Sequence, residues 1–275
     1  MNSLCIVNTL IPHGLGQSVL SDPQEGVAGF VELVRAAVDQ GASVLDLGSI
    51  SHYARTQEIV DRLCVAVSVV RDLYPDTIFQ VAPESLFELN MIVDRYAGLA
   101  PDIVSIPLAV LCSEAAMSVL DARRHEMGSL RQRLWLDVDD LSFVFRAVRM
   151  QHRGLLDGRL RMNFCFGREF GIPSDRDAFL FFVETLRRLA PEATWSGIGY
   201  GRSELELARW SIEMGGHCKA TMAIGRTPQG AHRAPESVTP GQVVRLCKEY
   251  GRRPATFAEA RHVLSLNCVT EHTTF

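Results

Sequence analysis

The sequence predicts a single (β/α)₈ barrel, the α/β TIM barrel fold, and three observations support this prediction. Short apolar runs alternate along the chain with longer amphipathic stretches, which is typical of parallel strands joined by helices. Eight such runs are present, the number of strands that closes this type of barrel. The chain has 275 residues, close to the ~250 residues of a typical barrel. We therefore expect one domain over 1–275 rather than an open sheet.

The expected elements follow one another without a linker. A strand is expected over 4–10, and apolar residues near helical spacing then predict a helix over 27–40. A second strand over 43–47 precedes a long helix over 55–74. The six remaining strands are expected at 77–81, 102–106, 133–138, 160–165, 193–198 and 217–222. Helices over 239–266 should pack on the barrel. In such barrels, chemistry occurs at the carboxyl ends of the strands, so the polar residues there are the candidates.

Composition excludes several classes of protein. Hydrophobic residues make up 47% of the chain and charged residues 22%, values typical of a globular protein. The net charge is −4 and no run of Lys or Arg is present, so we expect no nucleic-acid partner. There is no run of 18 apolar residues and no signal peptide, so we expect no membrane association. The seven cysteines are scattered, which favours reduced thiols and a cytoplasmic protein.

Three stretches of the chain carry a resemblance to a known family. They are Thr194–Arg202, with sequence TWSGIGYGR; Gly215–Lys219, with sequence GGHCK; and Gly251–Thr256, with sequence GRRPAT, followed by Glu259–Arg261 and Leu264. In this order they resemble the last third of the β-keto acid cleavage enzymes, which include 3-keto-5-aminohexanoate cleavage enzyme. Weaker similarity at Gly41-Ala42, at Pro101–Ile103 and at Gly171–Pro173 extends the resemblance over essentially the whole chain.

The resemblance implies a (β/α)₈ barrel, a homo-oligomer, and retro-Claisen cleavage of a β-keto acid with acetyl-CoA as the partner. It also implies a divalent metal, usually zinc, held by a His-x-His pair and a Glu. Here Asp46 and Gly48 stand in the two histidine positions, and Ala223-Ile224 replaces the family's Glu-Asp pair. Zinc needs three protein ligands and one open position, so we expect no metal at the family's site. If a zinc site had been rebuilt, the first ligands to suspect would be His13, Asp46 and His217.

Two charged residues remain where the chemistry would occur. Asp46 ends an expected strand and is a candidate acid/base, although it could equally be a former ligand that now only bonds to the loops. Lys219 stands where the resemblance implies an arginine beside the reacting carbonyl. It could bind a carboxylate, stabilise an enolate or form a Schiff base. It could also simply form a salt bridge with Asp46.

Six further residues are candidates for substrate binding. They are His13, Glu84, Ser85, Ser105, Tyr200 and Arg202. Each has a structural alternative. Ser85 could cap the next helix, Ser105 could be a satisfied polar residue inside the barrel, and Arg202 could be a charge at a helix start instead of a partner for carboxylate or phosphate.

These observations support two functional hypotheses. The first is an enzyme that acts on a small carboxylate or keto acid without a metal, in C–C bond cleavage by a lyase or acyltransferase reaction or in related carbonyl chemistry. Lys219 would be its electrophilic stabiliser and Asp46 its acid/base. The second is a non-catalytic homologue that binds a metabolite or a partner protein. An open, polar pocket at the carboxyl ends of the strands would favour the first, and one filled with apolar side chains would favour the second.

Overall fold

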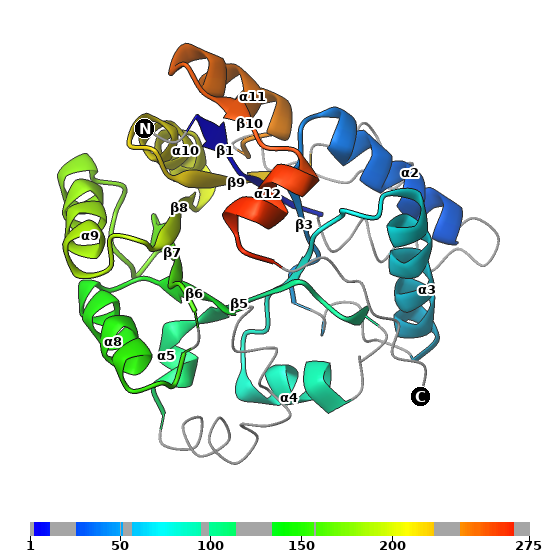
Figure 1. Ribbon diagram of the computed structural model, residues 1–275, viewed down its shortest axis with the longest axis horizontal. Coiled ribbons are helices and arrows are strands. Elements are labelled where there is room, and N and C mark those ends of the chain that lie inside the picture. The colour runs from blue at the N-terminus through cyan, green and yellow to red at the C-terminus, as the bar shows by residue number, and fades with distance from the viewer. Residues whose placement is uncertain are drawn as a thin grey trace.

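A computed structural model shows a closed barrel of eight parallel strands surrounded by helices, which confirms the predicted fold (Figure 1). The structure describes residues 3–11, 26–49, 51, 57–94, 99–113, 134–156, 158–222 and 237–266. Each barrel strand pairs with the next one along the chain, and the last pairs with the first. The strands are β2 (Val7–Leu10), β3 (Val44–Asp46), β4 (Phe79–Val81), β5 (Ile103–Pro107), β6 (Leu134–Val138), β7 (Arg161–Phe166), β8 (Thr194–Gly199) and β9 (His217–Thr221).

The helices form the outer layer of the barrel (Figure 1). They are α2 (Gly26–Asp39), α3 (Gln57–Leu73), α4 (Leu86–Asp94), the short α5 (Leu108–Leu111), α8 (Leu141–His152), α9 (Arg176–Leu189), α10 (Glu204–Glu213), preceded by the 3₁₀ turn η3 (Gly201–Ser203), and α11 (Pro240–Glu249). Alternate residues of each strand face these helices, because successive side chains of a strand point to opposite faces. On β7 and β8, Phe164, Phe166 and Trp195 pack in this way against Phe179 and Phe182 of α9.

Helix α12 (Phe257–Val263) closes the amino-terminal end of the barrel, which faces the viewer in Figure 1. Its Ala260 and the following Leu264 pack against Ile6, Ile103 and Trp135 in one apolar cluster. The short strand β10 (Arg253–Pro254) pairs in parallel with β1 (Leu4–Cys5) beside it. The apolar layer therefore fills the bottom of the barrel interior.

Two arginines from the stretch Gly251–Arg261, the third stretch of the family resemblance, stabilise this closed end. Arg261 forms a buried ion pair with Asp102, with Nη2 2.8 Å from Oδ1, and donates to the carbonyl of Thr77. Arg252 donates to the carbonyls of Ile212 and Gly216. These residues of the family resemblance thus stabilise the fold at the end opposite to the expected chemistry.

The first strand differs from its prediction. The expected strand 4–10 is interrupted at Ile6, because its first part pairs with β10 and its second part enters the barrel. The other expected strands match within one or two residues where the structure describes them. A single domain over 1–275 stays a prediction. Within the described ranges, no helix is both long enough and apolar enough to cross a membrane.

Candidate functional site

A polar layer lies inside the barrel above the apolar one. Each of the eight barrel strands contributes one side chain to it, and these are Asn8, Asp46, Gln80, Ser105, Asp137, Asn163, Ser196 and Lys219. All are buried or partly buried. Because buried polar groups are costly unless they are hydrogen-bonded, their partners decide what the layer can do. The bonds form two networks, one around Asp46 and one around Asp137.

Asp46 and Lys219 form the centre of the first network. Lys219 Nζ lies 2.7 Å from Asp46 Oδ2, and the Asp46 side chain is fully buried while that of Lys219 is 23% exposed. Gln80 Nε2 also donates to Asp46 Oδ2 at 2.9 Å, and the Gly48 amide donates to Oδ1 at 2.7 Å. Asn8 holds Gln80 through its Oε1 at 2.8 Å. Asp46 is therefore held rigidly, whereas the ammonium of Lys219 faces the more open side.

The electrostatics of this pair favour a charged lysine. Burial alone would lower the pKa of Lys219, but the adjacent Asp46, with help from Asp137, raises that pKa above its ordinary value. The Lys219 side chain is thus an ammonium throughout the physiological pH range. An ammonium can bind an oxyanion or a carboxylate, but it cannot attack a carbonyl until it loses its proton.

Asp137 is the centre of the second network. Its Oδ1 accepts hydrogen bonds from Ser105 Oγ and from Asn163 Nδ2, both at 2.7 Å, and Ser196 Oγ in turn donates to Asn163 Oδ1. Burial raises the pKa of Asp137, although these two donors and the charge of Lys219 partly offset the effect. The barrel thus presents a partly exposed carboxyl group near the Lys219 ammonium.

The predicted substrate-binding residues fall into separate places. Ser105 lies in the polar layer as a donor to Asp137. Tyr200 lies at the carboxyl end of β8, where its hydroxyl accepts from Arg168 Nη2 at 2.5 Å and donates to Cys165 Sγ at 3.8 Å. The Arg168 guanidinium lies over the Tyr200 ring, 4.5 Å from its centre. Arg202 is exposed in η3, beside the same strand end.

Glu84 and Ser85 support the loops around α4. The Ser85 hydroxyl accepts from the Glu88 amide at 3.2 Å, which is a helix-capping bond. The Glu84 side chain is exposed, and its amide donates to the Glu88 carboxylate at 2.8 Å. Glu88 also accepts from Ser49 in the loop after β3. His13 lies outside the described residues.

His217 lies two residues below Lys219 on β9, toward the closed end of the barrel. Its Nδ1 accepts a hydrogen bond from the Ile6 amide at 3.0 Å. Burial, together with the nearby Arg252, lowers the pKa of His217 to about 3, so the ring is neutral at physiological pH. The geometry thus gives His217 a partner in the fold and separates it from the Asp46 network.

The donor set at the family's metal position does not fit zinc. Both Asp46 oxygens already accept hydrogen bonds from Gly48, Gln80 and Lys219. The Lys219 ammonium lies 2.7 Å from Asp46 Oδ2, where its positive charge disfavours a second cation, and Gly48 has no side-chain ligand. Across the described part of the chain, no three His, Cys, Asp or Glu side chains are grouped as metal ligands would be. The loss of the family's metal site stays a prediction, as does the rebuilt site that would include His13.

Sequence reasoning did not select Gln80, Asp137 or Asn163 as site residues. Each lies within or at the end of a predicted strand, and the missing information was which strand face points inward. Reading alternate residues from Asp46 and Lys219 across the barrel register would have found them, because Asp46 pairs with Gln80, and Asp137 with Asn163.

The glycines of the resemblance have structural roles. A Cβ on Gly216 would come within 2.3 Å of the Trp195 ring, and one on Gly199 within 2.3 Å of the Ser203 backbone oxygen. The GGH and GIGYG stretches therefore allow close packing of β8, β9 and α10.

The chain is similar in sequence to a known family and to characterised members of it. The sequence profile of the beta-keto acid cleavage enzyme family (BKACE) matches residues 26–266. A 3-oxoadipate:acetyl-CoA acetyltransferase of Cupriavidus necator is 34% identical over 246 residues, covering 87% of both chains. A 3-keto-5-aminohexanoate cleavage enzyme of Acetoanaerobium sticklandii is 22% identical over 252 residues, covering 88% of this chain and 90% of the relative.

Solved structures share the fold at low sequence identity. The apo structure of ObcA has a TM-score of 0.61 at 16% identity, and the match covers 87% of this chain but 64% of ObcA. A hydroxymethylglutaryl-CoA lyase from Pseudomonas aeruginosa has a TM-score of 0.57 at 15% identity, covering 95% and 90% of the two chains. The family profile spans most of the barrel and the acetyltransferase is similar over nearly its whole length. The chain is therefore a member of the β-keto acid cleavage enzyme family.

Proposed function

We propose that this protein is an enzyme that acts on a small β-keto acid without a metal ion, with the Lys219 ammonium in place of the family's metal. One observation carries the proposal: Lys219 is held by a fully buried Asp46 but remains 23% exposed at the level of the polar layer. A fixed cation inside a barrel suits an anionic substrate. The named activities of the relatives, which include 3-oxoadipate:acetyl-CoA acetyltransferase, support a keto acid as the class of substrate.

Lys219 would supply electrostatic stabilisation. Cleavage of a β-keto acid places negative charge on a carbonyl oxygen as an enolate forms. A preorganised ammonium beside that oxygen stabilises the charge without having to reorganise. The raised pKa of Lys219 supports this role and argues against a Schiff base, because the neutral amine that an imine requires is disfavoured.

Asp46 would orient Lys219, and Asp137 would handle the proton. The hydrogen bonds from Gly48 and Gln80 leave Asp46 little freedom to move toward a substrate. Asp137 is partly exposed, and burial raises its pKa toward the range useful for acid/base chemistry. Of the two acid/base candidates, Asp137 thus fits the proton transfer better than Asp46.

The non-catalytic alternative remains the second candidate function. The predicted loss of the family's metal ligands favours it, because a binding scaffold would not need them. Its predicted signature was a pocket at the carboxyl ends of the strands filled with apolar side chains, whereas the described barrel interior carries two separate hydrogen-bonded polar networks. The polar layer supports the enzyme.

Acetyl-CoA as a co-substrate and a homo-oligomeric state belong to the same proposal. The activity named for the Cupriavidus relative supports acetyl-CoA as a co-substrate.

Exposed apolar side chains on α8, on α9 and in the loop after β7 offer surface for self-association, with Phe145 at 40%, Phe181 at 56% and Phe170 at 96% exposure. Light scattering of the purified protein would measure the oligomeric state directly.

The decisive experiment is a cleavage assay with a panel of β-keto acids, with and without acetyl-CoA, in the presence of a chelator. Products would be identified by mass spectrometry. We expect turnover that the chelator does not abolish and that Lys219→Met removes. Asp46→Asn should also reduce turnover, because Lys219 would lose the adjacent carboxylate that most opposes the effect of burial on its pKa. A panel without turnover, combined with binding of the same acids, would favour the non-catalytic alternative.

A further inference from the structure

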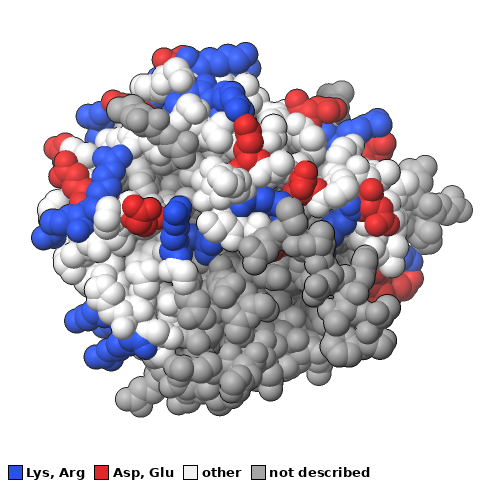
Figure 2. All heavy atoms as spheres, in the orientation of Figure 1, with Lys and Arg blue, Asp and Glu red and all other residues white. Residues whose placement is uncertain are grey.

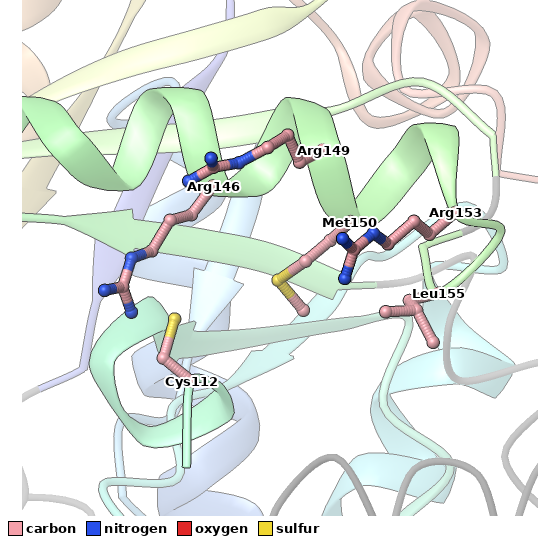
Figure 3. A pocket seen from close by; sticks show the side chains of 6 residues that line it. All are labelled: Cys112, Arg146, Arg149, Met150, Arg153 and Leu155. Atoms are coloured by element: carbon pink, nitrogen blue, oxygen red, sulfur yellow. The ribbon is translucent and has the colours of Figure 1, made fainter. Parts of the chain in front are cut away.

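A hollow on the outer side of the barrel lies between α5 and α8, away from the polar layer. It has a volume of about 230 Å³ and is lined by Cys112, Arg146, Arg149, Met150, Arg153 and Leu155. Figure 3 shows Arg146 reaching from α8 toward Cys112, and the side chains of Arg149 and Arg153 lying back along the helix. Three of the six lining side chains are therefore arginines, two within α8 and the third, Arg153, at its C-cap.

These arginines differ from most others in the described structure. Arginines on the neighbouring surface are matched with carboxylates, as in the pairs Arg159–Glu192, Arg176–Glu213 and Arg209–Glu249. Among the described residues, no carboxylate lies within ion-pair distance of Arg146, Arg149 or Arg153. In Figure 2 the basic side chains over α8, at the lower left, stand among uncharged atoms, whereas blue and red meet elsewhere on this face.

Two ordinary roles account for only part of the arrangement. Arg149 stands in the last turn of α8, where a positive charge complements the helix dipole. Arg146 packs over the Phe143 ring at 5.8 Å and contributes to lowering the pKa of Asp140, which hydrogen bonds from Ser142 lower more strongly. Neither role explains why three arginines line one hollow in a protein whose net charge is −4.

We propose that this hollow binds a small phosphate-bearing anion. Three guanidinium groups provide many N–H donors in fixed forks that match phosphate oxygens. A single carboxylate would balance one of the three charges, whereas a diphosphate balances most of them. The volume is below the ~300 Å³ of the smallest usual ligand pockets, which suits a diphosphate group better than a whole nucleotide. The ligand is either a free phosphorylated metabolite or the diphosphate of a larger molecule such as a coenzyme A thioester.

The proposal predicts binding of pyrophosphate to the intact protein. Isothermal titration calorimetry at low ionic strength should show binding that weakens as salt is added, because the charges of the three exposed arginines are screened by salt. The double variant Arg149→Gln/Arg153→Gln should bind at least tenfold more weakly. Glutamine keeps the helix propensity of α8. The matched control is Arg188→Gln, which removes an exposed arginine from α9 outside the hollow and should bind like the wild type.

Cys112 provides a second readout that requires no catalysis. Its half-buried thiol lines the hollow, so bound pyrophosphate should slow its alkylation by iodoacetamide, measured on the Cys112 peptide by mass spectrometry. The half-buried Cys64 on α3 should react at the same rate with or without pyrophosphate. If coenzyme A displaces pyrophosphate, the ligand is the diphosphate of a larger molecule. If coenzyme A does not displace it, the ligand is a free phosphorylated metabolite. Equal binding by the wild type and the double variant, or no protection of Cys112, would overturn the proposal.

Discussion

Lys219 on β9 reaches past β2 to Asp46 on β3, so that one ion pair at 2.7 Å joins strands 173 residues apart in sequence. The pair is asymmetric, since Asp46 is fully buried while Lys219 is 23% exposed. Removal of the lysine would leave a buried carboxylate without its counter-charge. Removal of the carboxylate would leave a lysine that can still reach solvent.

This asymmetry predicts different effects of two substitutions at Lys219. Lys219→Met should destabilise the fold by about 3 kcal/mol, the low end for a broken buried pair, because Gln80 and Gly48 still hold Asp46. Lys219→Arg should keep most of the stability, because it keeps the charge. Chemical denaturation measures both effects. Borohydride trapping with a keto acid, followed by mass spectrometry, should find no adduct on wild-type Lys219; an adduct would show that the amine acts as a nucleophile.

Metal content is a separate prediction. We expect the purified protein to contain far less than one zinc per chain, because Lys219 occupies the cation position beside Asp46 and Gly48 offers no ligand. Elemental analysis by plasma mass spectrometry after dialysis measures this content. One zinc per chain in the wild type, lost in Asp46→Ala, would instead show a rebuilt site. His13→Ala would then test the other candidate ligand.

The barrel could be predicted from the sequence because its signal is periodic and repeated. Each strand reads as a short apolar run, since the layer that faces the helices needs apolar side chains such as Leu45, Val104 and Phe164. The closed end was not predicted in detail. The roles of Arg252 and Arg261 depend on carbonyl groups that come together only after folding.

The site could be predicted only in part. Asp46 and Lys219 were selected because the family resemblance places them at a metal-ligand position and at an arginine position, and the structure places them in contact. Of the network around Asp137 only Ser105 was selected, since the inward direction of a strand residue depends on register. In contrast, Ser85 has the helix-capping bond that was its structural alternative.

Asp137 should affect activity more than stability. Burial raises its pKa, so its contribution to stability is fully present below the ordinary Asp value and is lost as the pH rises through the raised pKa. At pH 7 the folded protein must hold a charged carboxylate at this buried position, and Asp137→Asn removes the free-energy cost of doing so. The free energy of unfolding at pH 7 should therefore fall little or not at all. If Asp137 handles the proton, the variant should lose the limb of the pH–rate profile that lies above the ordinary Asp pKa. An unchanged profile would exclude this role.

His217 should make the fold sensitive to acid. Its pKa is lowered to about 3 from an ordinary value of 6.5, so its contribution to stability is present above pH 6.5 and is lost as the pH falls toward 3. The full effect is on the order of 5 kcal/mol. His217→Asn keeps an acceptor for the Ile6 amide but cannot be protonated, so its unfolding free energy should fall less between pH 6.5 and pH 4. The exposed His152 provides the control, because His152→Asn should follow the wild-type curve.

Substitution of the two arginines that pair with Asp102 should show which of them contributes more to stability at the closed end of the barrel. Arg261 is 6% exposed and lies 2.8 Å from Asp102, whereas Arg71 is 23% exposed and lies 3.2 Å away. Arg261 also donates to the carbonyls of Asp76 and Thr77, so Arg261→Met leaves several buried acceptors without a donor. We expect Arg261→Met to cost about 3 kcal/mol, because Asp102 keeps Arg71 and the Phe79 amide as partners.

Arg71→Met should cost less, about 1 kcal/mol, because Arg71 is more exposed and Asp102 keeps its buried partner. Arg253→Met, which breaks the exposed pair with Glu259, should have no resolvable effect and serves as the control. Urea denaturation of the three variants measures this order. If Arg71→Met proved the more damaging, the closed end would depend on the contact of α3 with β5 and not on α12. Since Arg261 lies far from the polar layer, any turnover that the folded Arg261→Met variant shows should match the wild type.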